Sequence, residues 1–373
     1  QHQSMSVISL EKQSNVTINP NLNPKDDYVD DTERVLFLIS MGQNARKSRI
    51  VERFVYSSRT RGKYNGWIVL LSDAPKSRYK ELNAWTDRLI HIQPNPQHLN
   101  PPSHNFSLPS MGYKRLKTYV LEYVATDRRL DNVQHVYYLD VDIVFGDSVW
   151  PMFHGLEPEY GITTGVSPVS SKLTTSAKGL MWMFHGNTPK WKIQGGQIFL
   201  HRQHSQPCLE RWRYLIDSAS MHARKDQDML MEMLQDQNTA IYDKKDLSTL
   251  ECEVVIMKQK PFIEFPKPQA IRKRAKQLKL AASSSSALTN ETSTVAPTAA
   301  PTEVPETTSS KSKRKKRKKS STSSNKDDDL TYYYAPLVHL RNDGGTKRIK
   351  PHVIKEYIQD VCNKSYNIFL AVT

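Results

Sequence analysis

The chain has 373 residues, 38% of them hydrophobic, and a net charge of +15 that invites a nucleic-acid-binding interpretation. Most of that charge is local, because residues 267–319 carry 14 Lys and Arg against three Glu, leaving only +4 for the rest. The charge of the folded part therefore predicts no nucleic-acid-binding surface. No run reaches the roughly 18 apolar residues that a membrane-spanning helix needs, although a sequence that begins at Gln1 leaves a preceding anchor or signal open.

The first part of the chain alternates short apolar runs with helical periodicity. Residues 1–31 are polar and rich in Asn and charge, and we expect them to form a flexible stem. Order should begin at the apolar run 34–40, which suits a buried parallel strand. A helix is expected over 45–60, and further strands over 67–71 and 89–92.

Another helix and strand continue this alternation. The Pro, Asn and Ser residues of 93–110 predict a long surface loop, and 113–126 has helical periodicity. That helix leads directly into the apolar run 136–145. Strands alternating with helices at this spacing are typical of a mostly parallel sheet flanked by helices, so the expected fold class is α/β.

The pattern is looser in the following segment. Short strands are expected over 161–166 and 195–200, with a Ser/Thr-rich loop over 167–190 between them. A helix is expected over 205–221, and another begins at Asp226, where acidic side chains favour a helix N-terminus.

The composition changes over residues 266–330. Ser, Thr, Pro, Ala and a basic run dominate there, and such a segment cannot bury a core, so we expect a disordered insertion. Structure should resume with a strand near 336–341 and a helix near 351–362. The chain therefore indicates one domain, formed by 32–265 and 331–365 and interrupted by the insertion.

The cysteines and glycosylation sequons leave the compartment open. Cys208, Cys252 and Cys362 show no metal-binding spacing, so they are reduced core residues or one disulfide with an odd thiol. Four N-x-S/T sequons occur where about three are expected by chance, and they favour a lumenal protein only mildly. The sequons lie at Asn15, Asn105, Asn290 and Asn363.

Two carboxylates, Asp140 and Asp142, interrupt the apolar run 136–145. An unpaired buried carboxylate costs several kcal/mol, and a divalent cation would offset that cost because hard cations bind carboxylate oxygens and substrate phosphates. On a straight strand the two would point to one face about 6.6 Å apart. Either Asp142 then holds the ion while Asp140 lies nearer a ribose or a metal-bound water, or the chain bends to bring both to it. Two solvated aspartates at a turn are the alternative.

Four motifs follow one another along the chain: Leu139-Asp140-Val141-Asp142, Gln194-Gly195-Gly196-Gln197, Asp226-Gln227-Asp228, and His339 followed by Gly344-Gly345-Thr346-Lys347. In this order they resemble the nucleotide-sugar glycosyltransferases of the GT-A fold, most closely the retaining branch. The resemblance covers roughly residues 34–260 and 335–350. It implies a Rossmann-like, mostly parallel sheet in a single domain.

The resemblance also implies a metal site. It assigns Asp140, Asp142 and His339 to a Mn²⁺ or Mg²⁺ ion, with Asp140 also near the ribose. A lone histidine after a strand is otherwise a satisfied structural residue, which is the alternative for His339.

Further residues match positions that bind the nucleotide part of the donor. Ser40 to Gly42 match the position that meets the uracil and ribose, and Lys347 matches a lysine that neutralises the departing diphosphate. Lys117, or Lys114, would meet phosphate or donor sugar, and a solvated helix face is the alternative for both.

The second and third motifs match positions around the donor sugar and the acceptor. The resemblance assigns binding to Gln194, Gly195, Gly196 and Asp228, and catalysis to Asp226 and Gln227. The alternatives are a glycine bulge with no substrate near it and aspartates that only cap a helix. The chain departs from the family where Gln-Gly-Gly replaces Asn-Ser-Gly and where Arg348-Ile349, not Pro-Trp, follows Lys347.

The expected function is metal-dependent transfer of a hexose or pentose from a nucleotide sugar, first a UDP-sugar, to a glycan or glycoprotein hydroxyl. The expected compartment is the Golgi lumen, with a membrane anchor in the full-length protein. Retention by front-side attack is favoured because the neutral Gln227 amide is a weak nucleophile; if configuration inverts, Asp226 is the general base. Two alternatives remain: an inactive GT-A domain serving as a glycan-binding or scaffold subunit, and a nucleic-acid-associated protein acting through its basic insertion.

Overall fold

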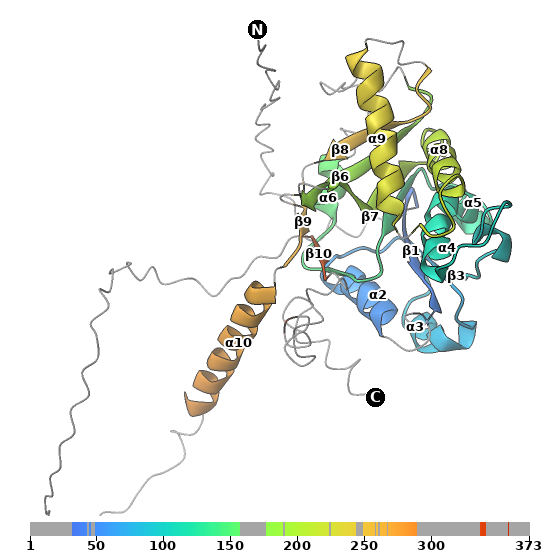
Figure 1. Cartoon of the computed structure of the whole chain (residues 1–373). Coiled ribbons are helices and arrows are strands. Elements are labelled where there is room, and N and C mark those ends of the chain that lie inside the picture. Colours follow the sequence, from blue (N-terminus) through green and yellow to red (C-terminus); the bar gives the residue numbers. More distant parts are fainter. Residues whose placement is uncertain are drawn as a thin grey trace, which may run out of the picture.

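The computed structural model describes residues 32–42, 45, 49–156, 177–188, 191–223, 225–243, 249–257, 259, 262–266, 268–288, 336–340 and 357. They form an α/β fold on a seven-stranded sheet (Figure 1). Across the sheet the strand order is β3 (Leu89–Ile92), β2 (Trp67–Ser72), β1 (Arg34–Ser40), β4 (His135–Leu139), β7 (Trp191–His201), β6 (Leu180–Thr188) and β8 (Glu253–Met257). The predicted fold class, a mostly parallel sheet flanked by helices, is confirmed.

The order of the strands creates a switch point in the sheet. β1 pairs in parallel with β2 and β4, β2 with β3, and β6 with β8, whereas β7 is antiparallel to β4 and β6. The chain adds β2 and β3 on one side of β1 and then places β4 on the other side. Ligands of open α/β sheets bind outside the carboxyl ends of the strands where the order reverses in this way. Here that place lies beyond Ser40 of β1 and Leu139 of β4.

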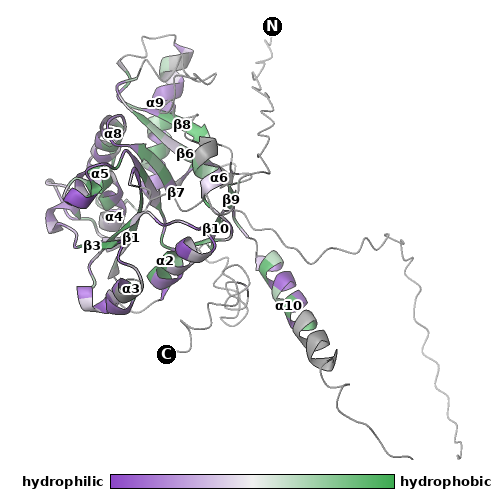
Figure 2. Ribbon diagram, turned by 180° about the vertical axis from the view of Figure 1, so that it is seen from behind, coloured by the Kyte–Doolittle hydropathy of each residue, from purple (hydrophilic) through white to green (hydrophobic). Residues whose placement is uncertain are grey.

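Helices cover both faces of the sheet, and each face has its own apolar core. On one face lie α2 (Ile50–Thr60) and α6 (Trp150–Leu156), against side chains that include Leu36 and Leu38. On the other lie α4 (Pro109–Arg115), α5 (Val120–Val124), α8 (Gln206–Asp217) and α9 (Asp226–Tyr242). Because successive strand side chains point to opposite faces, a strand covered on both sides is apolar throughout. Figure 2 shows this as hydrophobic colouring along the central strands.

The remaining elements of the main domain are short. They are α3 (Lys80–Trp85) and the 3₁₀ helices η1 (Lys76–Tyr79), η2 (Pro96–His98), η3 (Leu116–Tyr119) and η4 (Arg128–Leu130). The helix expected over 113–126 is therefore formed by α4, η3 and α5 in succession. A disulfide joins Cys208 of α8 to Cys252, next to β8. Of the two alternatives left open by the sequence, these two cysteines therefore form a disulfide and are not reduced core residues. None of the described helices is long and apolar enough to span a bilayer.

A small second sheet brings distant parts of the chain together. It consists of β5 (Ile143–Phe145), β10 (Leu337–His339) and β9 (Ile263–Glu264), with β10 in the middle. β10 is antiparallel to β5, and His339 pairs with Ile143. A strand near the C-terminal end of the sequence thus lies beside the segment that directly follows Asp142.

Two expectations from the sequence are wrong. Residues 180–188, expected within a loop, form β6, whose Met181, Trp182 and Met183 are buried and pair with β7 and β8. Part of the insertion expected to be disordered forms α10 (Pro268–Leu288), which projects from the domain in Figure 1. Helix-favouring Ala, Leu, Lys and Arg fill this segment, Pro268 suits a first helical position, and Ile271 and Ala275 are buried one turn apart.

Some predicted segments lie outside the described residues. They are the stem 1–31, the strand expected over 161–166, the rest of the insertion and nearly all of the helix expected over 351–362.

Candidate functional site

Asp140 and Asp142 lie in a sharp turn between β4 and β5. The turn is closed by the backbone N–H of Ile143, which donates to the carbonyl oxygen of Asp140 at 3.1 Å. The chain therefore bends directly after β4, which is one of the two geometries expected from the sequence. Both carboxylates are half-buried, with side-chain exposures of 31% for Asp140 and 17% for Asp142.

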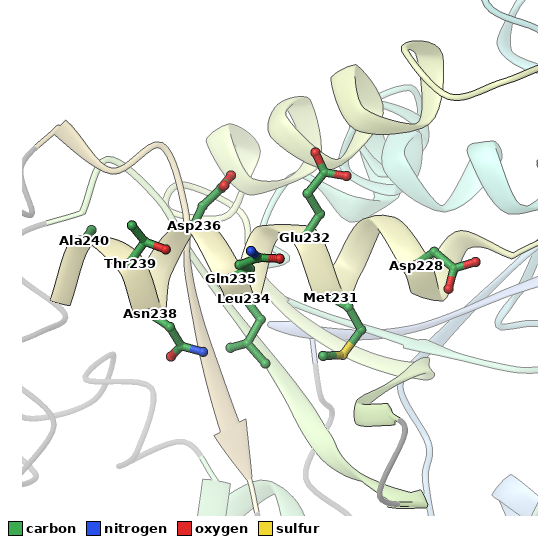
Figure 3. A pocket seen from close by; sticks show the side chains of 9 residues that line it. All are labelled: Asp228, Met231, Glu232, Leu234, Gln235, Asp236, Asn238, Thr239 and Ala240. Carbon is green, nitrogen blue, oxygen red and sulfur yellow. The ribbon is translucent and has the colours of Figure 1, made fainter. Parts of the chain in front are cut away.

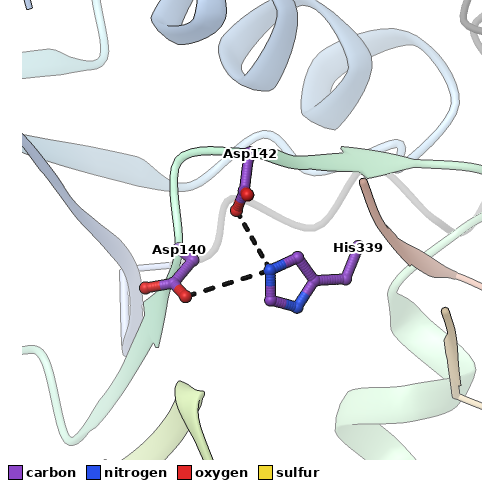
Figure 4. A group of neighbouring side chains, drawn as sticks. All are labelled: Asp140, Asp142 and His339. Carbon is purple, nitrogen blue, oxygen red and sulfur yellow. Dashed lines mark ion pairs between the residues drawn. The ribbon is translucent and has the colours of Figure 1, made fainter. Parts of the chain in front are cut away.

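His339 is brought to this turn by the pairing of β10 with β5. The N–H of Leu340 donates to the carbonyl oxygen of Asp142 at 3.1 Å and anchors the end of β10. The imidazole is buried, and its Nε2 lies 3.1 Å from Asp142 Oδ1 and 3.9 Å from Asp140 Oδ2 (Figure 4). Figure 4 shows that the three side chains converge from two elements that are far apart in the sequence.

These three side chains fit a divalent cation. Each offers one ligand atom, and the three atoms lie within 4.8 Å of one another. Two carboxylate oxygens with an imidazole nitrogen suit Mn²⁺ and related ions. The backbone of β7 leaves room for this arrangement only because residue 196 is glycine: a Cβ there would lie 2.3 Å from Asp140 Oδ2 and 3.1 Å from His339 Cε1. The cluster therefore has the donor set and the space that such an ion requires.

Neighbouring groups orient Asp140. Its backbone N–H donates to the carbonyl oxygen of Gly196 at 2.7 Å, and the hydroxyl of Tyr138 donates to its Oδ1 at 2.7 Å. Tyr138 and Asp140 stand two residues apart, so their side chains share one side of the strand. Burial and the charge of Asp140 raise the pKa of Tyr138 well above its usual value. The phenol therefore stays protonated and acts as a donor to the carboxylate.

Lys117 connects the turn to the start of α9. Its Nζ donates to the carbonyl oxygen of Gly195 at 2.7 Å and lies 3.2 Å from Asp226 Oδ2 and 3.5 Å from Asp140 Oδ1. Lys117 is buried, and this rules out the solvated helix face as its interpretation. Burial alone would lower the pKa of Lys117, but Asp140 and Asp226 outweigh it and raise this pKa. Lys117 therefore remains charged at neutral pH.

Asp226 is the buried anion of this group. Burial tends to raise its pKa, but Lys117, together with Lys114 at 3.5 Å, outweighs that tendency and lowers it. Asp226 is thus ionised at neutral pH and forms ion pairs with two lysines. Its contacts exceed those of an aspartate that only caps a helix.

Gln227 and Asp228 point to different surroundings. The Gln227 amide donates to the carbonyl oxygen of Ile193 on β7 at 2.8 Å. Asp228 is exposed and lines one end of a hollow of about 860 Å³ along α9 (Figure 3). Glu232 and Asn238 are among its other polar lining residues. The structure therefore places Gln227 against the sheet and Asp228 at the surface.

Gln194 and Gly195 lie in the buried part of β7. Gln194 is 6% exposed. A Cβ at Gly195 would lie 3.1 Å from Leu230 Cδ1 and 3.5 Å from Asp226 Oδ2, so this glycine allows α9 to approach the strand closely. Both glycines of the motif thus allow close packing of groups within the site.

Ser40 and Gly42 follow β1, at the other side of the switch point. Ser40 is 1% exposed. Gly42 has φ +64°, and its N–H donates to both carboxylate oxygens of Asp73 at 3.0 and 3.1 Å. A Cβ at Gly42 would lie 3.3 Å from the hydroxyl of Tyr113. This turn is therefore held from β2 and α4, beside the strand end that carries Asp140.

The structure brings most of the predicted site residues together by direct contact. Asp140, Asp142 and His339 form one cluster, and Lys117 joins it to Asp226 and to the backbone of β7. Lys347 lies outside the described residues, and its assignment stays a prediction.

Tyr138 and Asp73 were missed from the sequence, and Gln197 was named only as part of the second motif, without a role of its own. The Nε2 of Gln197 lies 2.8 Å from His339 Nδ1, and Gln197 is fully buried. A buried amide needs a hydrogen-bond partner, and the position of Gln197 in the second motif was a signal that could have identified it. Tyr138 lies two residues before Asp140, a spacing that places both side chains on one side of a strand. Asp73 directly follows β2, in the same position as Met41 after β1.

No protein-family model and no curated protein matches this sequence. Similar solved structures include the apo form of the glycosyltransferase GlyE of Streptococcus pneumoniae TIGR4, with 9% identity and a TM-score of 0.43 over 90% of this chain and 64% of that one. Mouse xyloside xylosyltransferase 1 is 9% identical, with a TM-score of 0.40 over 63% and 87%. The galactosyltransferase LgtC, in complex with donor and acceptor sugar analogs, is 11% identical, with a TM-score of 0.35 over 63% and 77%.

The chain spans 46% and 64% of the two GlyE chains that it matches. GlyE, xyloside xylosyltransferase 1 and LgtC are glycosyltransferases. Their identities and TM-scores are low, so the function of this chain has to be argued from its own site.

Proposed function

We propose that this chain is a metal-dependent glycosyltransferase that moves a sugar from a nucleotide-sugar donor to a hydroxyl of a glycan or glycoprotein. A UDP-sugar is the first candidate for the donor. The observation that carries the proposal is the cluster of Asp140, Asp142 and His339 at the carboxyl end of β4, beside the switch point. A hard cation held there would face a diphosphate bound across β1 and β4.

The nucleotide part of the donor is proposed to lie toward β1. The turn at Gly42 offers a tightly held backbone, and because its positive φ favours glycine, no Cβ occupies the space near Tyr113. Ser40 and Gly42 would meet the base and ribose. Lys347 would neutralise the diphosphate together with the ion, as the resemblance implies.

The chemistry is electrostatic stabilisation of separating charges. Breaking the bond to the anomeric carbon places negative charge on the diphosphate and positive charge on the sugar. The bound ion supplies Lewis-acid stabilisation of the diphosphate. Lys117 fixes Asp140 and Asp226 relative to each other, and the ionised Asp226 can stabilise positive charge on the sugar.

We propose that the reaction retains configuration. The pKa of Asp226 is lowered, and an anion already shared by two lysines is a weak proton acceptor, which disfavours it as a general base. Gln227 is neutral and donates its amide hydrogen to Ile193, so it is a weak nucleophile too. Front-side attack, in which the departing phosphate takes the acceptor proton, needs neither group as base or nucleophile.

We further propose that the protein works in an oxidising lumen such as that of the Golgi, with any anchor outside this sequence. The disulfide between Cys208 and Cys252 supports this, because such bonds persist in secretory compartments. Asn105, in one of the four sequons, is exposed and therefore accessible to modification. Treatment of the secreted protein with an enzyme that removes N-glycans would test this location. A decrease in apparent mass after the treatment is the expected result.

A donor screen tests the proposed activity. The purified protein is incubated with each nucleotide sugar, with Mn²⁺ or with a chelator, and released UDP or GDP is measured. We expect release from one donor class only with the ion, its loss in Asp142→Asn, and its retention in Asp147→Asn, which changes an exposed aspartate of the same segment. Nucleotide-sugar binding without any turnover would instead favour the inactive, glycan-binding alternative.

A further inference from the structure

The contact between Gln197 and His339 has a consequence for metal binding. The amide nitrogen of Gln197 lies 2.8 Å from His339 Nδ1, and both side chains are buried. The other imidazole nitrogen, Nε2, faces Asp142 Oδ1 at 3.1 Å. One ring nitrogen thus faces the amide and the other faces the carboxylates that would share the ion.

The protonation states of the two imidazole nitrogens depend on each other. A neutral imidazole has one N–H donor and one acceptor nitrogen. If the Gln197 amide donates to Nδ1, the ring proton is on Nε2 and donates to Asp142, so Nε2 has no lone pair for a metal. For Nε2 to bind an ion, the proton must be on Nδ1, where only an acceptor can satisfy it.

Gln197 carries such an acceptor. Its Oε1 is buried and finds no hydrogen-bond partner among the described residues. A half-turn of the amide exchanges its N–H₂ and C=O ends at almost no change in shape. Oε1 would then accept the Nδ1–H of His339, and the Nε2 lone pair would point toward Asp140 and Asp142.

We propose that Gln197 is a positioning residue that sets the tautomer of His339 for metal binding. With its amide nitrogen donating to Nδ1, the ring proton lies on Nε2 and is held by Asp142. With its carbonyl oxygen accepting the Nδ1–H, the Nε2 lone pair is left for the ion. An amide can serve both forms, whereas a carboxylate offers only acceptors and a leucine offers neither group.

This inference rests on the metal site of the proposed function and concerns how that site is prepared. It predicts that Gln197→Leu, which introduces an apolar side chain of similar size and removes the acceptor, weakens Mn²⁺ binding by about 10-fold or more, the usual effect of losing such a partner. Gln197→Glu retains an acceptor for Nδ1–H and should keep Mn²⁺ affinity near or above that of the wild type.

The experiment titrates Mn²⁺ alone into the full chain and follows free Mn²⁺ by electron paramagnetic resonance. The variants are Gln197→Leu, Gln197→Glu, His339→Ala and the double variant Gln197→Leu/His339→Ala. Gln237→Leu is the matched control: this buried glutamine of α9 binds both backbone groups of Val254, away from the cluster. Thermal unfolding of each variant checks that it folds, and Gln197→Glu decides the outcome if Gln197→Leu does not.

Nitrogen modulation of the Mn²⁺ echo signal gives a second readout, because it reports a histidine bound to the ion. We expect it in the wild type and in Gln197→Glu, and we expect it to be lost in His339→Ala and reduced in Gln197→Leu. The double variant should bind Mn²⁺ no more weakly than His339→Ala, because Gln197 acts only through His339.

Other results would overturn the proposal. Additive losses in the double variant would show that Gln197 acts independently of His339, and an unchanged affinity in a folded Gln197→Leu would show that it does not act on the ion. For Gln197→Glu, a loss of affinity and of nitrogen modulation would equally contradict it. If His339→Ala itself left Mn²⁺ binding unchanged, both this inference and the metal site of the proposed function would fail, whereas the first three results leave that site standing.

Discussion

Lys117 and Asp226 form a buried ion pair, with 3.2 Å between Nζ and Oδ2, at the junction of η3, β7 and α9. About a tenth of each side chain is exposed. The same ammonium group lies 3.5 Å from Asp140 and donates to the backbone of Gly195. One lysine therefore links the predicted metal site to the predicted catalytic helix start.

Replacing Lys117 by Met should destabilise the protein strongly. Removing one partner of a buried pair leaves an uncompensated charge and typically costs about 3–5 kcal/mol. Because Lys114 stays 3.5 Å from Asp226, we expect a value at the lower end, about 3 kcal/mol in urea unfolding. Lys114→Met, whose side chain is 28% exposed, should cost clearly less; equal losses for the two variants would contradict the central position of Lys117.

The lowered pKa of Asp226 predicts an acid-sensitive contribution to stability. A carboxylate whose pKa is lower in the folded state than in the unfolded state stabilises the fold at pH values above its unfolded-state pKa. This stabilisation is lost as the pH falls through the folded-state pKa. The free energy of unfolding of the wild type should therefore fall below about pH 4 more steeply than that of Asp226→Asn. Urea unfolding between neutral pH and pH 3 measures this, and parallel curves would show that Asp226 contributes no such term.

Gly196→Ala should damage the metal site with little effect on the rest of the fold. The added Cβ would lie 2.3 Å from Asp140 Oδ2, so the carboxylate must move away from His339. We expect Mn²⁺ affinity to fall by at least about 10-fold, or about 1.4 kcal/mol. Gly195→Ala is the control, because its Cβ meets Leu230 at 3.1 Å and not a metal ligand, and its Mn²⁺ affinity should stay close to that of the wild type. A similar loss in both variants would mean that β7 tolerates no side chain in general.

The fold could largely be predicted from the sequence, and the reasons are physical. Strands such as 34–40 and 67–71 are covered on both faces, so their apolar runs are continuous and easy to recognise. β6 is not expected from the sequence because Ser/Thr-rich residues directly precede it, and together they resemble one long loop. α10 is not expected because Ser, Thr, Pro and Ala dominate the composition of the whole insertion, although Pro268–Leu288 alone favours a helix.

The site could be predicted only in part. Residue type indicated Asp140, Asp142 and His339, but no local pattern shows that β10 pairs with β5 and brings His339 to the turn. Lys117 was ambiguous for the same reason: its buried position depends on contacts with Asp226 and Gly195, which lie far away in the sequence. Gln197 and Tyr138 contact other side chains of the site. The sequence places one in the second motif and the other two residues before Asp140, but it does not reveal these contacts.

Reduction of the disulfide should weaken the junction of α8 and β8. Cys208 and Cys252 are 44 residues apart, and closing a loop of this length stabilises a fold by about 4 kcal/mol in the chain-entropy description. The double variant Cys208→Ala/Cys252→Ala should therefore unfold at clearly lower urea than the oxidised wild type. Identical unfolding of the variant and the oxidised protein would contradict a stabilising role of this bond.

The central claim is that Asp140, Asp142 and His339 hold an ion that anchors the diphosphate of a nucleotide sugar. Calorimetric titration of UDP and GDP into the protein, with Mn²⁺ and with a chelator, tests it most directly. The account predicts that one of the two nucleotides binds in the presence of Mn²⁺, and that the chelator or the Asp142→Asn substitution removes this binding while the fold stays intact. Equal nucleotide binding under all these conditions, or none with Mn²⁺ present, would contradict it.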